Sequence, residues 1–284
     1  YKFSGSSLSS DKKTLISLIA EILRKPNFKA DYYQRIKEET KRGLAQAKTR
    51  QDSLLNMYFF KEIYEGHPYS FAYDYDLQRE ALANINPNSL KKFYQNNIGP
   101  NNLTIGIVGD INIEEIKRLV KEEFGSWSQK EIKLKQPELK MDSLAQNKIK
   151  VVNKPDASQA KIRLGYNFYN NKFEDRIAFK MANRVYGGGS FSSRLMENLR
   201  SDKGYVYSIY SKSNYYRLGG AYYIETEVKP NKAYQTVKAV KNEMLAIKEG
   251  REPITKEELK DNINLYNALL PKSYQQKVDI LEQI

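Results

Sequence analysis

One histidine, His67, and the lack of any cysteine limit the chemistry open to this chain of 284 residues. Without cysteine there is no disulfide, no thiol nucleophile and no cysteine-ligated zinc or iron–sulfur centre. The same count excludes any site that takes two histidines from this chain. His67 stands between Gly66 and Pro68, which favours a plain loop position, and no Ser/His/Asp triad can be built convincingly around it.

The most distinctive residues lie in the segment Gly187–Ser211, GGGSFSSRLMENLRSDKGYVYSIYS. Three glycines open it, and Arg200 and Tyr207 follow, seven positions apart. The run is not a nucleotide-binding loop, because the chain has neither GxGxxG after a strand nor GxxxxGK[ST]. Taken alone, the glycines predict a helix-ending turn with positive φ. Arg200 would cap its helix or pair with Glu197, and Tyr207 would be one of several strand tyrosines.

This segment resembles the second-domain signature of the pitrilysin/insulinase family of zinc metallopeptidases. In that family a glycine-rich turn leads to a helix with Ser-Arg-Leu, and an Arg and then a strand Tyr follow. Arg200 and Tyr207 match those two positions. Asn101–Trp127 is similar to the strand, Gly-Asp turn and helix that close the first domain, and Ile19–Phe28 is similar to its helix before an Asn-Pro-type stop. The resemblance spans nearly the whole chain.

The resemblance implies that the chain takes part in peptide hydrolysis. Arg200 would hold carbonyl or carboxylate groups of a peptide through its fork of donors. Tyr207 would donate a hydrogen bond to the oxyanion of the tetrahedral intermediate. Gly188, Gly189 and Ser190 would let the peptide approach. The implied partners are a peptide substrate and a zinc-bearing HxxEH subunit or domain, so that Arg200 and Tyr207 act in trans.

The family binds zinc through the two histidines of HxxEH and a distal glutamate, and the glutamate of the motif is the general base. HxxEH is absent here, and Gln46 follows Glu39 at the spacing of the distal ligand. A neutral amide is a poorer zinc ligand than a carboxylate. We therefore expect no cofactor in this chain, zinc in the catalytic domain or partner, and no peptidase activity from the chain alone. A shift by one helical turn would instead bring Glu38 or Glu39 to the ligand position.

Hydrophobic periodicity, caps and Gly/Pro stops predict the elements that position these residues. We expect helices at about 11–25, 30–48, 53–64, 87–94, 113–124, 174–186, 190–200, 231–249 and 254–270. We expect strands at about 2–7, 103–108, 148–152, 160–166, 205–210 and 221–228.

The beginning and the end of the chain share one order of elements. Residues 1–50 and 221–270 each read as strand, capped helix, Pro-marked loop and charged helix, at an offset near 220. Such a repeat predicts two copies of one unit. The fold class is therefore α+β, with two repeated α/β-sandwich units in which helices pack on a mixed or antiparallel sheet. Both copies look truncated, as in the middle of a longer chain.

Two domains follow from the repeat. We place the first, metallopeptidase-like domain, without its N-terminal part, at 1–130, and the second, inactive-type domain with the Arg/Tyr pair at 145–284. A polar segment at 126–147 is the predicted linker.

A net charge of +13 requires a nucleic-acid partner to be weighed. The lysines usually stand beside acidic residues, and no basic run is interleaved with stacking aromatic residues, so we expect no nucleic-acid partner. No apolar stretch approaches the ~18 residues of a membrane span. Two alternatives remain: a fragment of an active zinc metalloendopeptidase whose HxxEH precedes Tyr1, and a non-catalytic structural subunit. Periplasm and cytoplasm both remain open.

Overall fold

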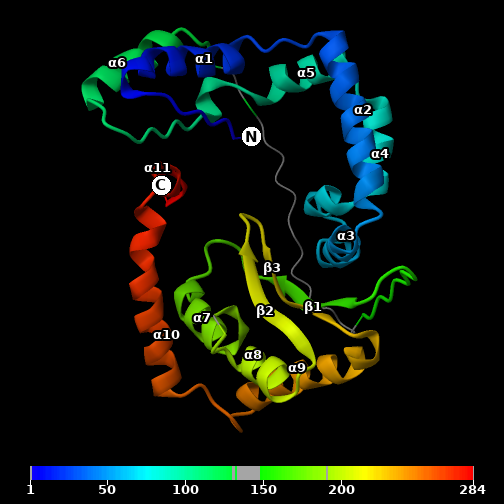
Figure 1. Ribbon diagram of the computed structural model, residues 1–284. Helices are drawn as coiled ribbons and strands as arrows, with labels where there is room; N and C mark the ends of the chain where they lie inside the picture. Colours follow the sequence, from blue (N-terminus) through cyan, green and yellow to red (C-terminus); the bar gives the residue numbers. More distant parts are fainter. Residues whose placement is uncertain (1, 130–131, 133–147, 190, 284) are drawn as a thin grey trace. The chain divides into compact units, whose positions relative to one another are not determined.

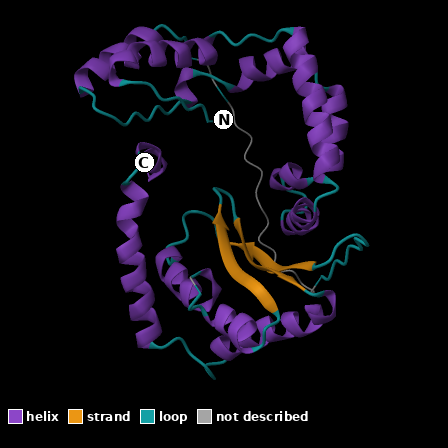
Figure 2. Ribbon diagram, viewed as in Figure 1, coloured by secondary structure: helices purple, strands orange, loops and turns teal. Residues whose placement is uncertain are grey.

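The structure, a computed structural model, describes residues 2–129, 132, 148–189 and 191–283 (Figure 1). In this part of the chain, helices accompany one antiparallel sheet of three strands, which confirms the α+β class (Figure 2). The predicted linker lies mostly outside the described residues. Among the helices described, none has the length and apolar character needed to cross a membrane.

The chain divides into two compact units that are interleaved in sequence. The first unit is made of Tyr1–Lys41, Ala81–Gln136 and Leu269–Ile284, and the second of Arg42–Glu80 and Pro137–Ala268. The predicted domains at 1–130 and 145–284 are a different division, and that division stays a prediction.

The first unit is helical. Its helices, two of which (α2 and α4) are shared with the second unit, are α1 (Lys12–Arg24), α2 (Ala30–Ala47), α4 (Tyr75–Asn84), α5 (Pro87–Asn97), α6 (Ile113–Phe124) and α11 (Lys277–Gln283). Helix α1 packs against α6 through a small cluster of Ile16, Ile116 and Leu119. A hydrogen bond of 2.5 Å from Ser17 Oγ to Glu123 Oε1 joins the same two helices. These contacts make α1 and α6 the core of the unit.

The second unit contains the whole sheet. Its elements are α3 (Gln51–Ile63), β1 (Ala160–Phe168), α7 (Arg176–Asn183), α8 (Arg194–Met196), β2 (Val206–Tyr215), β3 (Gly220–Val228), α9 (Ala233–Lys248) and α10 (Lys256–Leu269). The strand order is β1-β3-β2, and both pairs are antiparallel. Two short π-helical segments, Arg184–Gly188 after α7 and Glu197–Asp202 after α8, complete the helical side.

Most of the predicted helices are confirmed, but three predicted strands are wrong. Residues 2–7, 103–108 and 148–152 have no regular secondary structure. A strand requires a neighbour for its backbone groups, and no other extended segment in the described part of the chain pairs with these three. Helices α4 and α11 were not predicted. Helices lie at the expected positions of both predicted copies, α1 and α2 in the first and α9 and α10 in the second, but the strand expected to open the first copy is not formed. The repeat itself stays a prediction.

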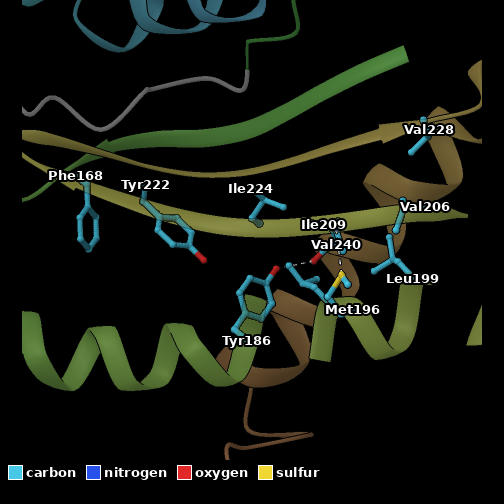
Figure 3. Packing of buried hydrophobic residues seen from close by; sticks show 11 residues of the cluster. Phe168, Tyr186, Met196, Leu199, Val206, Ile209, Tyr222, Ile224, Val228 and Val240 are labelled. Carbon is cyan, nitrogen blue, oxygen red and sulfur yellow. Dashed lines mark hydrogen bonds between the residues drawn. The ribbon is translucent and has the colours of Figure 1, made fainter. Parts of the chain in front are cut away.

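Strand β3 lies at the centre of the sheet and is buried on both faces. Tyr222 and Ile224 belong to the main core with residues of α8 and α9 (Figure 3). Ala221 and Tyr223, which alternate with them, pack against Phe60 and its neighbours on α3. Because successive side chains of a strand point to opposite faces, one strand holds α8 and α9 on one side and α3 on the other.

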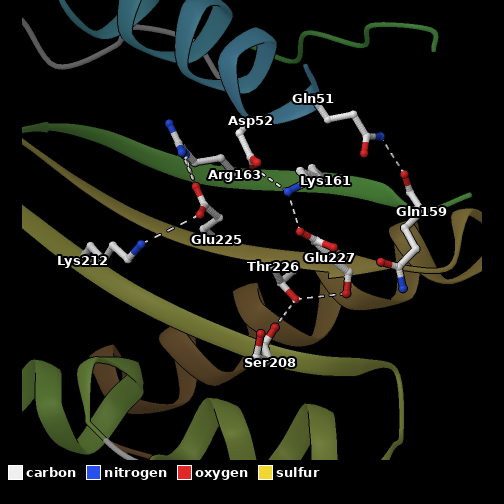
Figure 4. A network of polar contacts seen from close by, with 10 residues as sticks. All are labelled: Gln51, Asp52, Gln159, Lys161, Arg163, Ser208, Lys212, Glu225, Thr226 and Glu227. Atoms are coloured by element: carbon white, nitrogen blue, oxygen red, sulfur yellow. Dashed lines mark hydrogen bonds and ion pairs between the residues drawn. The ribbon is translucent and has the colours of Figure 1, made fainter. Parts of the chain in front are cut away.

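Charged side chains fasten α3 to the sheet (Figure 4). Arg163 on β1 donates to Glu225 on β3, with 2.8 Å from Nε to Oε2, and to Asn56 Oδ1 on α3 at 2.7 Å. Its guanidinium also lies 4.6 Å from the centre of the Tyr223 ring. The neighbouring Lys161 pairs with both Asp52 and Glu227. Since the Arg163 side chain is only 6% exposed, this ion pair is largely removed from solvent.

We predict that Arg163→Met lowers the free energy of unfolding by about 3 kcal/mol, because Glu225 is left partly buried without its main cation. Urea denaturation of the purified chain measures this change. Lys48→Ala is the control, because its pair with Asp76 is exposed and should contribute at most about 0.5 kcal/mol. Equal losses for the two variants would contradict a structural role for Arg163.

Candidate functional site

Arg200 and Tyr207, the pair predicted from the sequence, lie next to each other. The Cζ atom of Arg200 stands 5.2 Å from the centre of the Tyr207 ring, within the range of a cation–π contact. Arg200 belongs to the π-helical segment after α8 and is half-buried, whereas Tyr207 on β2 is 80% exposed. The pair therefore forms part of the open surface of the second unit.

The guanidinium of Arg200 forms no ion pair and no side-chain hydrogen bond with the described residues. Glu197, one turn earlier, is exposed and does not pair with it. An arginine has five N–H donors and no acceptor. Within the described part of the chain, those donors remain available to a ligand.

Tyr207 reaches the surface because β2 has one residue more than β3 in this region. Val206 pairs with Val228. The next registered pair is Ile209 with Thr226, so three steps along β2 match two along β3. This β-bulge lets Val206 and Ile209 both point into the core and turns Tyr207 outward. The strand position of Tyr207 is confirmed, whereas the bulge, which depends on the register with β3, was not predicted.

A second ring, that of Phe191, also lies against Arg200. The distance from Arg200 Cζ to the ring centre is 4.6 Å. Phe191 follows the glycine run and is 66% exposed. It was not predicted as a site residue. The signal available was a large apolar side chain beside three glycines, just before the Ser-Ser-Arg-Leu helix.

The glycine run differs from its prediction. In the described part of the chain, positive φ occurs at Gly66, Gly204 and Gly250 only, so the expected positive φ within Gly187–Gly189 is wrong. The run needs glycine for close packing instead. A Cβ atom at Gly187 would stand 2.6 Å from Leu195 Cδ1, which brings the backbone directly onto α8.

The next two glycines are packed in the same way. A Cβ atom at Gly188 would meet Asn183 Nδ2 at 2.3 Å, and one at Gly189 would meet the Arg184 carbonyl oxygen at 2.4 Å. The predicted contacts of Gly188, Gly189 and Ser190 with a peptide stay predictions, and Ser190 lies outside the described residues.

A buried polar network lies beneath the glycine run. Asn183 Oδ1 accepts hydrogen bonds from Ser211 Oγ at 2.6 Å and from the Tyr222 hydroxyl at 3.0 Å. Burial raises the pKa of Tyr222, so that its hydroxyl stays protonated and donates. The network joins the end of α7 to β2 and β3 and fixes the start of the run.

Arg194 anchors the segment that leads to the site. Its Nε and Nη2 atoms donate to the two oxygens of Glu258 on α10 at 2.7 and 2.8 Å. Its remaining donors reach the carbonyl oxygens of Glu252 at 2.7 Å and Pro253 at 2.9 Å. Glu258 also accepts from the backbone N–H of Thr255 at 2.8 Å, as in a capping box. The bidentate pair therefore locks α8 to the first turn of α10.

His67 is a structural residue. It lies between α3 and the 3-10 helix Pro68–Tyr73, which confirms the predicted loop position. It is only 4% exposed, and its Nδ1 atom accepts from the Tyr69 backbone N–H at 3.1 Å. Its ring centre stands 4.3 Å from that of Tyr69. The histidine thus caps a short helix and packs on an aromatic ring.

The described residues do not fit a zinc site. Gln46, at the position predicted for the distal ligand, is exposed on α2, as are Glu38 and Glu39. In the described part of the chain, no three His, Cys, Asp or Glu residues are grouped so that they could hold a metal ion. The zinc that the resemblance implies has no set of ligands among these residues.

Known proteins are similar to this chain in sequence. The peptidase M16 inactive domain family matches residues 84–266. An uncharacterized zinc protease of Bacillus subtilis is 29% identical over 74% of this chain and 49% of its own length. A non-peptidase homolog of Helicobacter pylori is 24% identical over 87% of this chain and 55% of its own length. The chain thus spans about half the length of these curated relatives.

Solved structures share the fold. The peptidase M16 inactive domain from Pseudomonas fluorescens has a TM-score of 0.80 at 22% identity, over 98% of this chain and 64% of that one. Pitrilysin has a TM-score of 0.60 at 18% identity, over 87% of this chain and 27% of its own.

The Arg194–Glu258 pair predicts a pH dependence of stability. The hydrogen bonds from Arg194 lower the pKa of Glu258 from 4.5 to about 2. Because the folded state holds this pKa down, the contribution is complete above pH 4.5 and is lost as the pH falls toward 2. We expect Glu258→Gln to remove about 2 kcal/mol near pH 7, allowing for solvent screening, and to match the unaltered chain near pH 2.

Urea denaturation across this pH range measures the difference. Glu249→Gln is the control, because Glu249 pairs with Arg251 at the surface and should show little change at any pH. A Glu258→Gln difference that does not vary with pH would contradict the assignment.

The absence of a ligand set among the described residues predicts that the purified chain does not retain zinc. After loading with zinc and dialysis against a weak chelator, metal analysis should find far less than one zinc per chain. An HxxEH-containing peptidase treated in parallel should keep its metal. Stoichiometric zinc in this chain would contradict the prediction.

Proposed function

The chain belongs to the peptidase M16 inactive-domain family, and we propose that it binds the peptide substrate of a zinc-dependent M16 peptidase through Arg200 and Tyr207. The zinc is held elsewhere, by an HxxEH-bearing domain or partner subunit. The chain contributes substrate contacts and no metal. We expect it to be inactive alone and to support hydrolysis in a heterodimer or in a longer polypeptide.

The observation that supports this proposal is the open Arg200–Tyr207 pair. A β-bulge turns Tyr207 outward, and Arg200 lies 5.2 Å from its ring without an acidic partner among the described residues. An arginine that served only stability would gain from a carboxylate. Exposed rings and unused donors on one surface are instead typical of a place where a ligand binds.

The two side chains would have separate tasks. The guanidinium of Arg200 donates two parallel hydrogen bonds to a peptide carboxylate, or one to a carbonyl oxygen. The Tyr207 hydroxyl donates to the oxygen of the scissile carbonyl, on which negative charge develops during attack. A hydrogen bond that strengthens only in the transition state raises kcat, whereas one made equally to the bound substrate lowers KM. Tyr207 should therefore act mainly on kcat and Arg200 mainly on KM.

The relatives leave two other functions to be tested. The Bacillus subtilis relative is named a zinc protease and is about twice as long as the segment matched here, which is compatible with an active enzyme whose HxxEH lies in another part. The Helicobacter pylori relative is named a non-peptidase homolog, which favours a structural subunit. In a structural subunit, neither Arg200 nor Tyr207 would affect hydrolysis.

Two substitutions separate these possibilities. Tyr207→Phe keeps the ring over Arg200 and removes only the hydroxyl, so kcat should fall about 100-fold, or about 3 kcal/mol, with KM little changed. Arg200→Lys keeps the charge and loses the fork, so KM should rise about 10-fold. The assay uses one fluorogenic peptide and this chain assembled with its HxxEH-bearing partner.

Tyr210→Phe is the matched control. It removes a hydroxyl from another exposed tyrosine of β2 and should leave both constants unchanged. Unchanged kcat and KM in the Tyr207 and Arg200 variants, with the complex still assembled, would reject the proposal in favour of the structural subunit.

A further inference from the structure

We infer that Phe191 is a positioning residue of this site: it holds the Arg200 guanidinium in place against Tyr207 and keeps its donor edge directed at the peptide. The inference rests on the proposed function and adds a third residue to it. It comes from a contact in the structure, since Phe191 was not among the site residues predicted from the sequence.

Two rings lie against Arg200. The Cζ atom is 4.6 Å from the centre of the Phe191 ring and 5.2 Å from that of Tyr207. Each ring is within the range of a cation–π contact, so the guanidinium of Arg200 has two aromatic neighbours.

A guanidinium held in this way keeps its hydrogen-bonding capacity. Aromatic rings attract the flat face of the cation, whereas the N–H donors lie in its plane. Arg200 forms no side-chain hydrogen bond with the described residues. Stacking thus restricts the rotamers of a long side chain before a ligand arrives, which lowers the entropy lost on binding.

The position of Phe191 is itself constrained. It follows the glycine run, in which a Cβ atom added at Gly187 would stand 2.6 Å from Leu195 Cδ1 on α8. After it, Arg194 is locked to Glu258 by two hydrogen bonds of 2.7 and 2.8 Å. The chain is thus fixed a few residues before and after Phe191. Yet Phe191 is 66% exposed, so it gains little from burial and its main described contact is with Arg200.

The stack can be observed without any peptide. In the full chain, NMR should show the Arg200 Hε and Hδ resonances shifted upfield by the two rings, with the assignment made from their loss in Arg200→Lys. Phe191→Leu should remove part of the shift, and Phe191→Trp should retain it. Phe3→Leu, the same change at another exposed phenylalanine, should leave the Arg200 resonances unchanged.

Kinetics then test the positioning role. With the chain assembled with its HxxEH-bearing partner and the same fluorogenic peptide, Phe191→Leu should raise KM about 3-fold to 10-fold, with kcat within about 2-fold, because exposed cation–π contacts are individually weak. Phe191→Trp should keep KM at the value of the unaltered chain. Phe3→Leu should match the unaltered chain.

The possible results separate this inference from the proposed function. Arg200 resonances without an upfield shift, or unchanged by Phe191→Leu, overturn the inference. So does an unchanged KM in Phe191→Leu when Arg200→Lys raises KM, and in that case the proposed function stands. If Arg200→Lys leaves KM unchanged, the proposed function fails, and the role of Phe191 in peptide binding fails with it.

Discussion

The central strand β3 is the constraint on which the second unit depends. It forms backbone ladders with β1 on one side and β2 on the other. Its alternating side chains enter the main core on one face and the α3 cluster on the opposite face. Because both edges and both faces are in use, a shift of register by one residue would move every one of these side chains to the wrong face at once. The position of β3 therefore fixes the register of β1 and β2.

The bulge in β2 follows from this fixed position of β3. With β3 unable to slip, the additional residue must be accommodated in β2 alone, between Val206 and Ile209. Both of these side chains stay in the core, so the backbone between them bends and Tyr207 points outward. The same core holds α8 through Leu195 and Met196, and the π-helical turn that follows presents Arg200. Sheet register and helix packing together bring the two side chains into contact.

The sequence allowed much of this to be predicted, because helices depend mainly on local pattern. The strong apolar periodicity of α1, α6 and α7 predicted them correctly, and Asn86-Pro87 marked the start of α5. The strands predicted at 2–7, 103–108 and 148–152 failed because a strand needs a partner that local pattern does not reveal. The same limit explains the missed bulge and the missed Phe191. Each depends on which segment lies opposite, and the family resemblance of the segment could suggest only Arg200 and Tyr207.

Three arginines of the second unit differ in whether their charge is paired with a carboxylate within the fold. Arg163 and Arg194 each donate to a glutamate, with Nε distances of 2.8 and 2.7 Å, and have side chains only 6% and 15% exposed. Their charge is satisfied within the fold, and removing either partner would leave an unpaired group. Arg200 has aromatic rings in place of a carboxylate.

Rings stabilise the cation without neutralising it, because the quadrupole of a ring attracts charge but accepts no strong hydrogen bond from the in-plane donors. The positive charge and the fork of Arg200 therefore remain available, whereas Arg163 and Arg194 are paired with glutamates within the fold. A peptide offers the carbonyl and carboxylate oxygens that complete such a group. Under the proposed function, a domain with one histidine and no cysteine would serve a hydrolytic site through charge and hydrogen bonding, with the metal held by another domain or partner.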